Sequence, residues 1–298
     1  MSEIDVIRIA SAQYNISQFQ SSLEFEAKLK QWVEEATVMQ ADILLFPEYG
    51  AMELTSLFDS RVQQDLQQQI AVMQELLSWY VESYQNVARQ YRRIIVASSF
   101  PVKENEKTVN RSFVFFPDGS YAFQDKLQMT RFEKEQWNIQ GGKHQIVFQG
   151  DNFTFAVCLC YDIEFPIITR KLAESGAQII LVPSCTDSES GYHRVKIACQ
   201  ARALENQCAV IQAPTVGDAA WSRATDTNYG AAGFFVPPDT GLPANGILAL
   251  GEINQAKWLI EDIDLNQLSR VRNDGQVLNH QDWSSQLSLS HSPKKYFF

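Results

Sequence analysis

The sequence lacks long apolar runs and an excess of basic residues. No apolar stretch approaches the ~20 residues that a membrane-spanning helix needs. The 298 residues include 25 Lys and Arg against 35 Asp and Glu, which gives a net charge of -10. A negative charge disfavours binding to nucleic acid or to an anionic membrane surface. We therefore expect no nucleic-acid partner and no membrane partner.

The first residues lack the order of a signal peptide. Residues 1–5 (MSEID) are acidic, whereas a signal peptide begins with basic residues and continues into an apolar stretch. We predict a cytoplasmic protein.

Patterns typical of metal sites and disulfide frameworks are also missing. The chain has no C-x-x-C pair and no H-E-x-x-H, and its four histidines are scattered. An odd count of five cysteines in a chain of this length does not indicate a disulfide framework. Cys158 and Cys160 share one face of a predicted strand, where two neighbours are poorly placed to bond each other. We expect no metal and no cofactor.

No linker divides the chain. Low-complexity tracts, Gly/Ser-rich or Pro-rich linkers and blocks of like charge are absent, so we predict a single domain over residues 1–298. Apolar patterns predict helices and strands that alternate through much of the chain, which indicates sheets covered by helices. The predicted helices cover residues 22–40, 62–91, 166–175 and 193–206. The predicted strands cover residues 7–13, 43–46, 94–100, 110–116, 121–126, 147–148, 153–159, 179–183, 209–213, 231–236, 246–250 and 258–263.

Three chemically distinctive residues follow predicted strands. Glu48 comes after Pro47, Cys160 after the apolar run 153–159, and Ser184 after the strand 179–183. In open α/β sheets, ligands bind beyond the carboxyl ends of the strands. We expect a site at this edge of the sheet.

Cys160 is the candidate nucleophile at that edge. A thiol reacts as the thiolate, which a neighbouring base or cation favours. No histidine follows a strand in the same way, but a glutamate such as Glu48 can take the thiol proton. Lys126 and the backbone N–H of Tyr161 can stabilise an oxyanion. From the residues alone this remains one hypothesis, because Glu, Lys and Cys are common.

Three separated segments resemble the signatures of the nitrilase superfamily of carbon-nitrogen hydrolases. They are residues 45–50 (LFPEYG), 125–133 (DKLQMTRFE) and 160–166 (CYDIEFP). Two further segments, 182–184 (VPS) and 201–207 (ARALENQ), follow in the family's order. The resemblance covers nearly the whole chain. It implies that Glu48 is the base, Lys126 the catalytic lysine and Cys160 the nucleophile.

The resemblance also implies a fold and a reaction. The family fold is an α/β four-layered α-β-β-α sandwich that usually dimerises, so we expect a homodimer or a higher homo-oligomer. The implied reaction is hydrolysis of a non-peptide C–N bond in a small-molecule amide by water, through a thioester on Cys160 and without a cofactor. The alternatives are transfer of the acyl group to an amine, hydrolysis of a carbamoylated amine, and a non-catalytic binding module.

Two details of the motifs bear on the substrate and on the branch of the family that the chain resembles. Tyr161-Asp162 resembles the amidase-like branch rather than the Trp-Glu of true nitrilases, which favours an amide over a nitrile. The segments around Met129 and Cys185 resemble a poorly characterised branch, some of whose members carry an acetyltransferase domain, and no substrate is settled for it.

Many members of the family have a second glutamate near the lysine. Here Glu133 and Glu135 are the candidates, and the order Lys126, Thr130, Glu133, Trp137 favours Glu133. The alternative for either residue is a solvated surface carboxylate.

Several neighbours of these motifs have two readings each. Tyr49 and Tyr161 are either walls of a substrate pocket or core residues with a bonded hydroxyl. Ser184 either touches substrate or serves a turn. Cys185 is expected to be a small buried residue rather than a second nucleophile.

The later part of the chain offers three weaker expectations. His193 either lines the pocket or begins a helix and bonds to backbone. Trp221 and Asn228 lie in a loop that could approach the site. The tail, residues 283–298, ends in aromatic residues that are costly to expose, and in the resembled family such tails often pack on a partner subunit. We predict that contact here.

Overall fold

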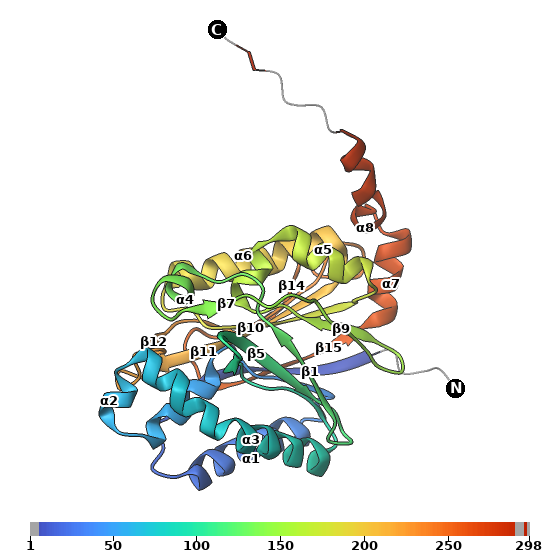
Figure 1. Cartoon of the computed structure of the whole chain (residues 1–298). Coiled ribbons are helices and arrows are strands. Elements are labelled where there is room, and N and C mark those ends of the chain that lie inside the picture. The colour runs from blue at the N-terminus through green and yellow to red at the C-terminus, as the bar shows by residue number, and fades with distance from the viewer. Residues whose placement is uncertain (1–5, 290–294, 297–298) are drawn as a thin grey trace.

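Two β-sheets pack face to face between two layers of helices (Figure 1). The protein is described by a computed structural model that places residues 6–289 and 295–296. The first sheet contains β1 (Val6–Asn15), β2 (Ile43–Leu45), β3 (Ile94–Val96), β4 (Phe100–Glu104), β5 (Lys107–Phe115), β6 (Tyr121–Asp125), β7 (Ile139–Gln140) and β15 (Lys257–Asp264). The second contains β8 (Val147–Gln149), β9 (Thr154–Val157), β10 (Ile179–Ser184), β11 (Ala209–Asp218), β13 (Gly233–Phe235) and β14 (Ile247–Leu250), and β12 (Thr227–Asn228) pairs with the end of β11.

β1 joins the two sheets. It pairs with β15 over residues 6–13 and with β2 over residues 9–11, and its last two residues, Tyr14 and Asn15, pair with Thr215 and Val216 of β11. The parallel strands β2, β1, β11, β10 and β9 therefore lie in order across the centre of the molecule. Their carboxyl ends meet at one edge, as the strand pattern predicts.

Alternation along the strands builds the layers. In β2, Ile43 and Leu45 pack in the core between the sheets, whereas Leu44 belongs to the core beneath α1 and α3. In β9, Phe155 faces the other sheet and Ala156 faces the helices of the second layer. Both sheets are thus apolar on both faces, which is why their strands read as continuous apolar runs. The predicted four-layered α-β-β-α sandwich is confirmed.

Helices cover both outer faces. Figure 1 shows α1 and α3 on one side of the molecule and α5 and α6 on the other. The α-helices are α1 (Ser22–Val38), α2 (Ser60–Gln63), α3 (Leu66–Tyr91), α4 (Arg131–Glu135), α5 (Pro166–Glu174), α6 (Glu189–Asn206), α7 (Leu265–Asp274) and α8 (Asn279–Asp282). The 3-10 helices are η1 (Gly50–Leu57), η2 (Cys160–Glu164) and η3 (Trp283–Leu289).

Several helices differ from the sequence prediction, and α6 begins at Glu189 rather than at residue 193. The single helix predicted over residues 62–91 is wrong, because the Asp65 carboxylate accepts the N–H groups of Gln67 and Gln68 at 2.9 and 3.0 Å and starts α3 anew. Helix α7 was not predicted at all. Its N-cap, Asp264, accepts the N–H of Gln267 at 2.8 Å, and its buried residues Leu265, Leu268 and Val271 recur at every third position.

The C-terminal segment leaves the sandwich past α8 (Figure 1). Its first residue, Trp283, packs under the guanidinium of Arg170 in α5, with 4.9 Å between the Arg170 carbon and the ring centroid. Residues 290–294, 297 and 298 of the tail lie outside the described residues, and its contact with a partner subunit stays a prediction. Within residues 6–289 and 295–296, no helix is long and apolar enough to cross a membrane.

Candidate active site

Glu48 lies three residues beyond the end of β2 and directly follows Pro47. Tyr49 adopts a left-handed conformation with φ of 54° and turns the chain into η1. Its N–H donates to the Ser99 hydroxyl at 2.8 Å, and the N–H of Ser99 donates to the Pro47 carbonyl at 3.1 Å. These bonds hold the turn to the segment after β3, and the Glu48 side chain is buried.

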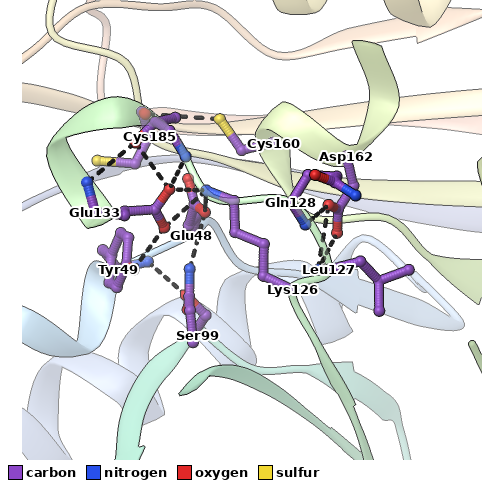
Figure 2. Close-up of polar contacts among 12 residues, drawn as sticks. Glu48, Tyr49, Ser99, Lys126, Leu127, Gln128, Glu133, Cys160, Asp162 and Cys185 are labelled. Atoms are coloured by element: carbon purple, nitrogen blue, oxygen red, sulfur yellow. Dashed lines mark hydrogen bonds and ion pairs between the residues drawn. The ribbon is translucent and has the colours of Figure 1, made fainter. Parts of the chain in front are cut away.

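Lys126 follows β6 directly and lies between two carboxylates. Its backbone N–H donates to the Asn110 carbonyl of β5 at 2.9 Å. Its Nζ is 2.7 Å from Glu48 Oε1 and 2.7 Å from Glu133 Oε2 (Figure 2). All three side chains are at most 3% exposed, so the ammonium group balances buried negative charge rather than solvent-facing charge.

Glu133 is held by a short helix of its own. Thr130 caps α4 with a capping box, in which its hydroxyl accepts the Glu133 N–H and the Glu133 carboxylate accepts the Thr130 N–H at 2.8 Å. The other carboxylate oxygen accepts the Tyr49 hydroxyl at 2.7 Å. Both carboxylate oxygens of Glu133 are therefore held by hydrogen bonds that do not involve Lys126.

Cys160 opens η2 with a left-handed φ of 44°. Strand β9 ends at Val157, so Cys160 lies on a turn rather than at the last residue of the strand. Its Sγ donates a weak hydrogen bond to the carbonyl of Cys185 at 3.7 Å (Figure 2). Backbone strain of this kind recurs at active sites, where the surrounding structure fixes it.

The four side chains share one cavity of about 290 Å³. Glu48, Lys126, Glu133 and Cys160 are among its buried lining residues, and Figure 2 shows the two carboxylates pointing at the Lys126 amino group. The full lining is Glu48, Tyr49, Lys126, Thr130, Phe132, Glu133, Trp137, Cys160, Glu164, Cys185, Thr186, Asp187, Gly191, Arg194, Val195, Arg223, Ala224, Thr225, Asp226 and Thr227. A small organic molecule fits a cavity of this size.

A comparison with family models matches residues 8–246 to the model described as carbon-nitrogen hydrolase. The chain belongs to the carbon-nitrogen hydrolase family. A protein of Bacillus subtilis (strain 168) named "Probable hydrolase YhcX" is 33% identical over 276 residues, which cover 93% of this chain and 53% of that protein. A deaminated glutathione amidase of Synechocystis sp. (strain PCC 6803 / GT-S) is 28% identical over 146 residues, which cover 45% of this chain and 54% of that protein. The chain thus spans about half the length of these two relatives.

The fold comparison agrees. The structure of an amidase from Nesterenkonia AN1, a member of the nitrilase superfamily, superposes with a TM-score of 0.72 at 20% identity. The match covers 95% of this chain and 96% of that one. This superposition shows the shared fold, and the family model confirms the predicted membership among the carbon-nitrogen hydrolases of the nitrilase superfamily.

Burial and charge shift the titration of this carbon-nitrogen hydrolase's central groups. Burial raises the pKa of Glu48 to about 7, although the Lys126 ammonium opposes the shift. Burial lowers the pKa of Lys126, but the carboxylates of Glu133 and Glu48 outweigh it and hold that pKa well above its usual value. Burial and the charge of Glu48 raise the pKa of the Cys160 thiol. The resting thiol is therefore neutral, and its reaction requires a base beside it.

The remaining predicted residues divide into those on the cavity and those away from it. Tyr49 lines the cavity, and its ring packs against Trp137 with 4.6 Å between centroids. The Tyr161 ring packs on Phe165 instead, at 4.9 Å, and is not part of the lining. Ser184 is fully buried and donates to the Ala213 carbonyl at 3.3 Å, so the structure does not bring it to the cavity.

Cys185 lies on the cavity in place of Ser184. Its thiol donates to Asn228 Oδ1 at 3.4 Å, and burial raises its pKa to about 12. His193 is exposed and lies 3.7 Å from Glu189, away from the cavity. The loop that contains Trp221 does reach the site, but through residues 223–227 rather than through Trp221 or Asn228.

Sequence reasoning missed two buried residues that hold the central groups. Asn110 Nδ2 donates to Glu48 Oε1 at 2.9 Å, and the carboxylate of Asp162 contacts the segment after Lys126. Neither Asn110 nor Asp162 belongs to a periodic sequence pattern that would predict its role. The capping box at Thr130 and Glu133, in contrast, is visible in the sequence as T-x-x-E.

The structure distinguishes the two candidates for the second glutamate, Glu133 and Glu135. Glu133 contacts Lys126, whereas Glu135 pairs with Arg131 on the surface, where the two side chains are 55% and 89% exposed. We expect Glu133→Gln to lower kcat by about 10²-fold, because the loss of one charged partner lets Lys126 shift from its position. The matched control Glu135→Gln removes only an exposed pair and should leave kcat unchanged. Equal kcat values for the two variants in steady-state assays would contradict this assignment.

The pKa of Glu48 predicts a pH dependence. Above about pH 7 the carboxylate is ionised and can accept the thiol proton, and below it the carboxyl is protonated. We expect kcat/KM for an amide to fall by up to about tenfold per pH unit below that pH. The rate of Cys160 alkylation by iodoacetamide should follow the same curve. A flat kcat/KM profile down to pH 5 would rule out Glu48 as the base.

Proposed function

We propose that the protein hydrolyses the C–N bond of a small, linear, non-peptide amide through a thioester on Cys160. The observation that carries the proposal is the presence of a thiol, a carboxylate and an ammonium group in one buried cavity, with 2.7 Å between Glu48 Oε1 and Lys126 Nζ. The amidase names among its relatives support an amide as the substrate.

The first half of the reaction forms the thioester. Glu48 takes the proton of the Cys160 thiol as Sγ attacks the amide carbonyl carbon, and the carbonyl oxygen becomes an oxyanion. Lys126 and the backbone N–H of Tyr161 stabilise that oxyanion. Glu48 then gives its proton to the nitrogen, the C–N bond breaks, and ammonia leaves.

The second half returns the enzyme to its starting state. Glu48 takes a proton from water, and the resulting hydroxide attacks the thioester carbonyl, where Lys126 again faces the oxyanion. The C–S bond breaks, Cys160 leaves as the thiolate, and the proton held by Glu48 returns to it. The products are a carboxylic acid and ammonia.

The Glu48 pKa of about 7 suits both roles. A group that must accept a proton and later donate it works best when its pKa lies near the working pH. A carboxylate with an ordinary pKa would be a weaker base toward a thiol. The burial of Glu48 therefore supports its double role.

The proposal is tested by ammonia release from a panel of small primary amides, ω-amides and carbamoylated amines. We expect turnover of at least one amide by the wild-type protein, dependent on Cys160. Release of both ammonia and carbon dioxide from a carbamoylated amine would favour the carbamoyl reading. No turnover across an extended panel, with Cys160 no more reactive than Cys158, would favour a non-catalytic binding module.

Hydrolysis and acyl transfer share the thioester and are separated by its fate. With hydroxylamine added to the assay, the thioester partitions between free acid and hydroxamate. We expect free acid to remain the main product at low hydroxylamine concentrations. Hydroxamate in large excess over acid at such concentrations would instead favour transfer to an amine.

A further inference from the structure

Asp162 lies two residues after Cys160 on the same 3-10 turn. Its backbone N–H donates to the Leu159 carbonyl at 2.9 Å, which closes the turn around Cys160. Its side chain is only 2% exposed and does not line the catalytic cavity. The carboxylate is therefore a buried charge that the proposed reaction does not use.

The carboxylate binds the backbone that directly follows Lys126. The N–H of Leu127 lies 3.0 and 3.2 Å from its two oxygens, and the N–H of Gln128 donates to Oδ1 at 2.6 Å (Figure 2). Leu127 and Gln128 follow β6, so these N–H groups have left the strand ladder. One carboxylate satisfies both donors.

This contact connects segments that are 34 and 35 residues apart in the chain. One carries the nucleophile, and the other carries the lysine that faces the oxyanion. The distance between Cys160 Sγ and Lys126 Nζ depends on how the two segments sit against each other. A fixed separation matters because a misplacement of about 1 Å can cost about 10²-fold in rate.

We propose that Asp162 is a positioning residue that sets the distance and orientation of Cys160 relative to Lys126. The inference rests on the proposed function, because it assigns Asp162 to the geometry of that reaction. Asp162 touches neither substrate nor the reacting atoms. It acts through the turn that holds the nucleophile and through the backbone that holds the lysine.

The chain offers a matched control. Asp239 is also a buried carboxylate, 8% exposed, and it accepts the N–H of Thr240 at 2.6 Å and that of Gln276 at 3.1 Å. It joins two loops that do not line the catalytic cavity. Asp162→Asn and Asp239→Asn thus remove the same kind of charge from the same kind of contact.

The test compares kcat, KM and the thermal unfolding midpoint of the wild type, Asp162→Asn and Asp239→Asn with an amide that the wild type hydrolyses. Burial raises the pKa of Asp162 to about 7, so assays at pH 8 keep the wild-type side chain ionised. We expect Asp162→Asn to lower kcat by about 10- to 100-fold with KM nearly unchanged, and Asp239→Asn to keep the wild-type kcat even where its midpoint falls. A wild-type kcat for Asp162→Asn, or an equal loss of kcat in both variants, would overturn the inference.

A second variant covers a failure of Asp162→Asn to fold. Asp162→Glu keeps the charge and lengthens the side chain by one methylene, so it should push the two segments apart and also lower kcat. A wild-type kcat for this variant would likewise overturn the inference. Cys160→Ala, assayed in parallel, distinguishes a failure of the proposed function from a failure of the positioning role. If Cys160→Ala retains turnover, the proposed function fails. If turnover depends on Cys160 but is unchanged in the Asp162 variants, only the positioning role is overturned.

Discussion

Replacing Cys160 by alanine is expected to abolish amide turnover, with a loss on the order of 10⁶-fold in kcat, as for removal of the nucleophile of a hydrolytic triad. Without the thiol no thioester forms, and the proton acceptor Glu48 has nothing to activate for the first step. The protein should still fold, since the side chain is small. Ammonia release and the thermal unfolding midpoint are measured together.

Cys158 provides the control for this substitution. It lies two residues earlier, is 1% exposed and faces the same helix layer, but it does not line the cavity. Cys158→Ala should therefore cost a similar amount of packing and leave kcat near that of the wild type. Turnover by Cys160→Ala within tenfold of the wild type would contradict the covalent mechanism.

Alkylation gives a second measurement that needs no substrate. Iodoacetamide should label Cys160 faster than any other thiol, because it combines access from the cavity with a base and an ammonium group beside it. Mass spectrometry of the intact protein and of Cys160→Ser locates the label. Preferred labelling of Cys185, which also lines the cavity, would show that access alone decides the reactivity.

The sequence predicts the region of the site better than the direction of each side chain. Glu48 and Cys160 were expected at strand ends because apolar runs stop beside Pro47 and before Tyr161, and both residues do lie at that edge of the sheet. The same reasoning selected Ser184, yet β10 continues through it and buries its hydroxyl against Ala213. A shift of one residue turns a side chain to the other face of a strand, and so Cys185 lies on the cavity instead.

Other features needed tertiary contacts to be recognised. The left-handed φ of 44° at Cys160 has no signal in an ordinary Leu-Cys-Tyr sequence. Asn110 and Asp162 are single buried polar residues, and their partners lie 62 and 35 or 34 residues away. Local patterns predict elements, whereas contacts over such separations depend on the packing of the whole sandwich.

Lys126→Met is expected to lower kcat by at least about 10²–10³-fold, the usual effect of losing one oxyanion donor. Methionine is unbranched and only one atom shorter, but it has no charge and no N–H groups. The substitution also leaves Glu48 and Glu133 buried without the cation that lies 2.7 Å from each. Because Lys126 lowers the pKa of Glu48, its loss should raise that pKa further. The acid limb of kcat/KM should therefore move to higher pH, which a loss of packing alone would not produce.

Lys28 provides the matched control, because it is largely buried, pairs with the buried Glu53 at 2.7 Å and does not line the cavity. Lys28→Met leaves the buried Glu53 carboxylate without its cation, although Tyr14 and Ser17 still donate to it, so the free energy of unfolding should fall by up to about 3–5 kcal/mol. We expect both variants to lose stability. Only Lys126→Met should also show a lower kcat and an acid limb of kcat/KM that is moved to higher pH. If Lys28→Met lowered kcat as much as Lys126→Met, the lysine between Glu48 and Glu133 would be a structural counter-ion and the oxyanion would need another donor. If Lys126→Met alone is impaired, its ammonium group acts on the charge that develops in the reaction.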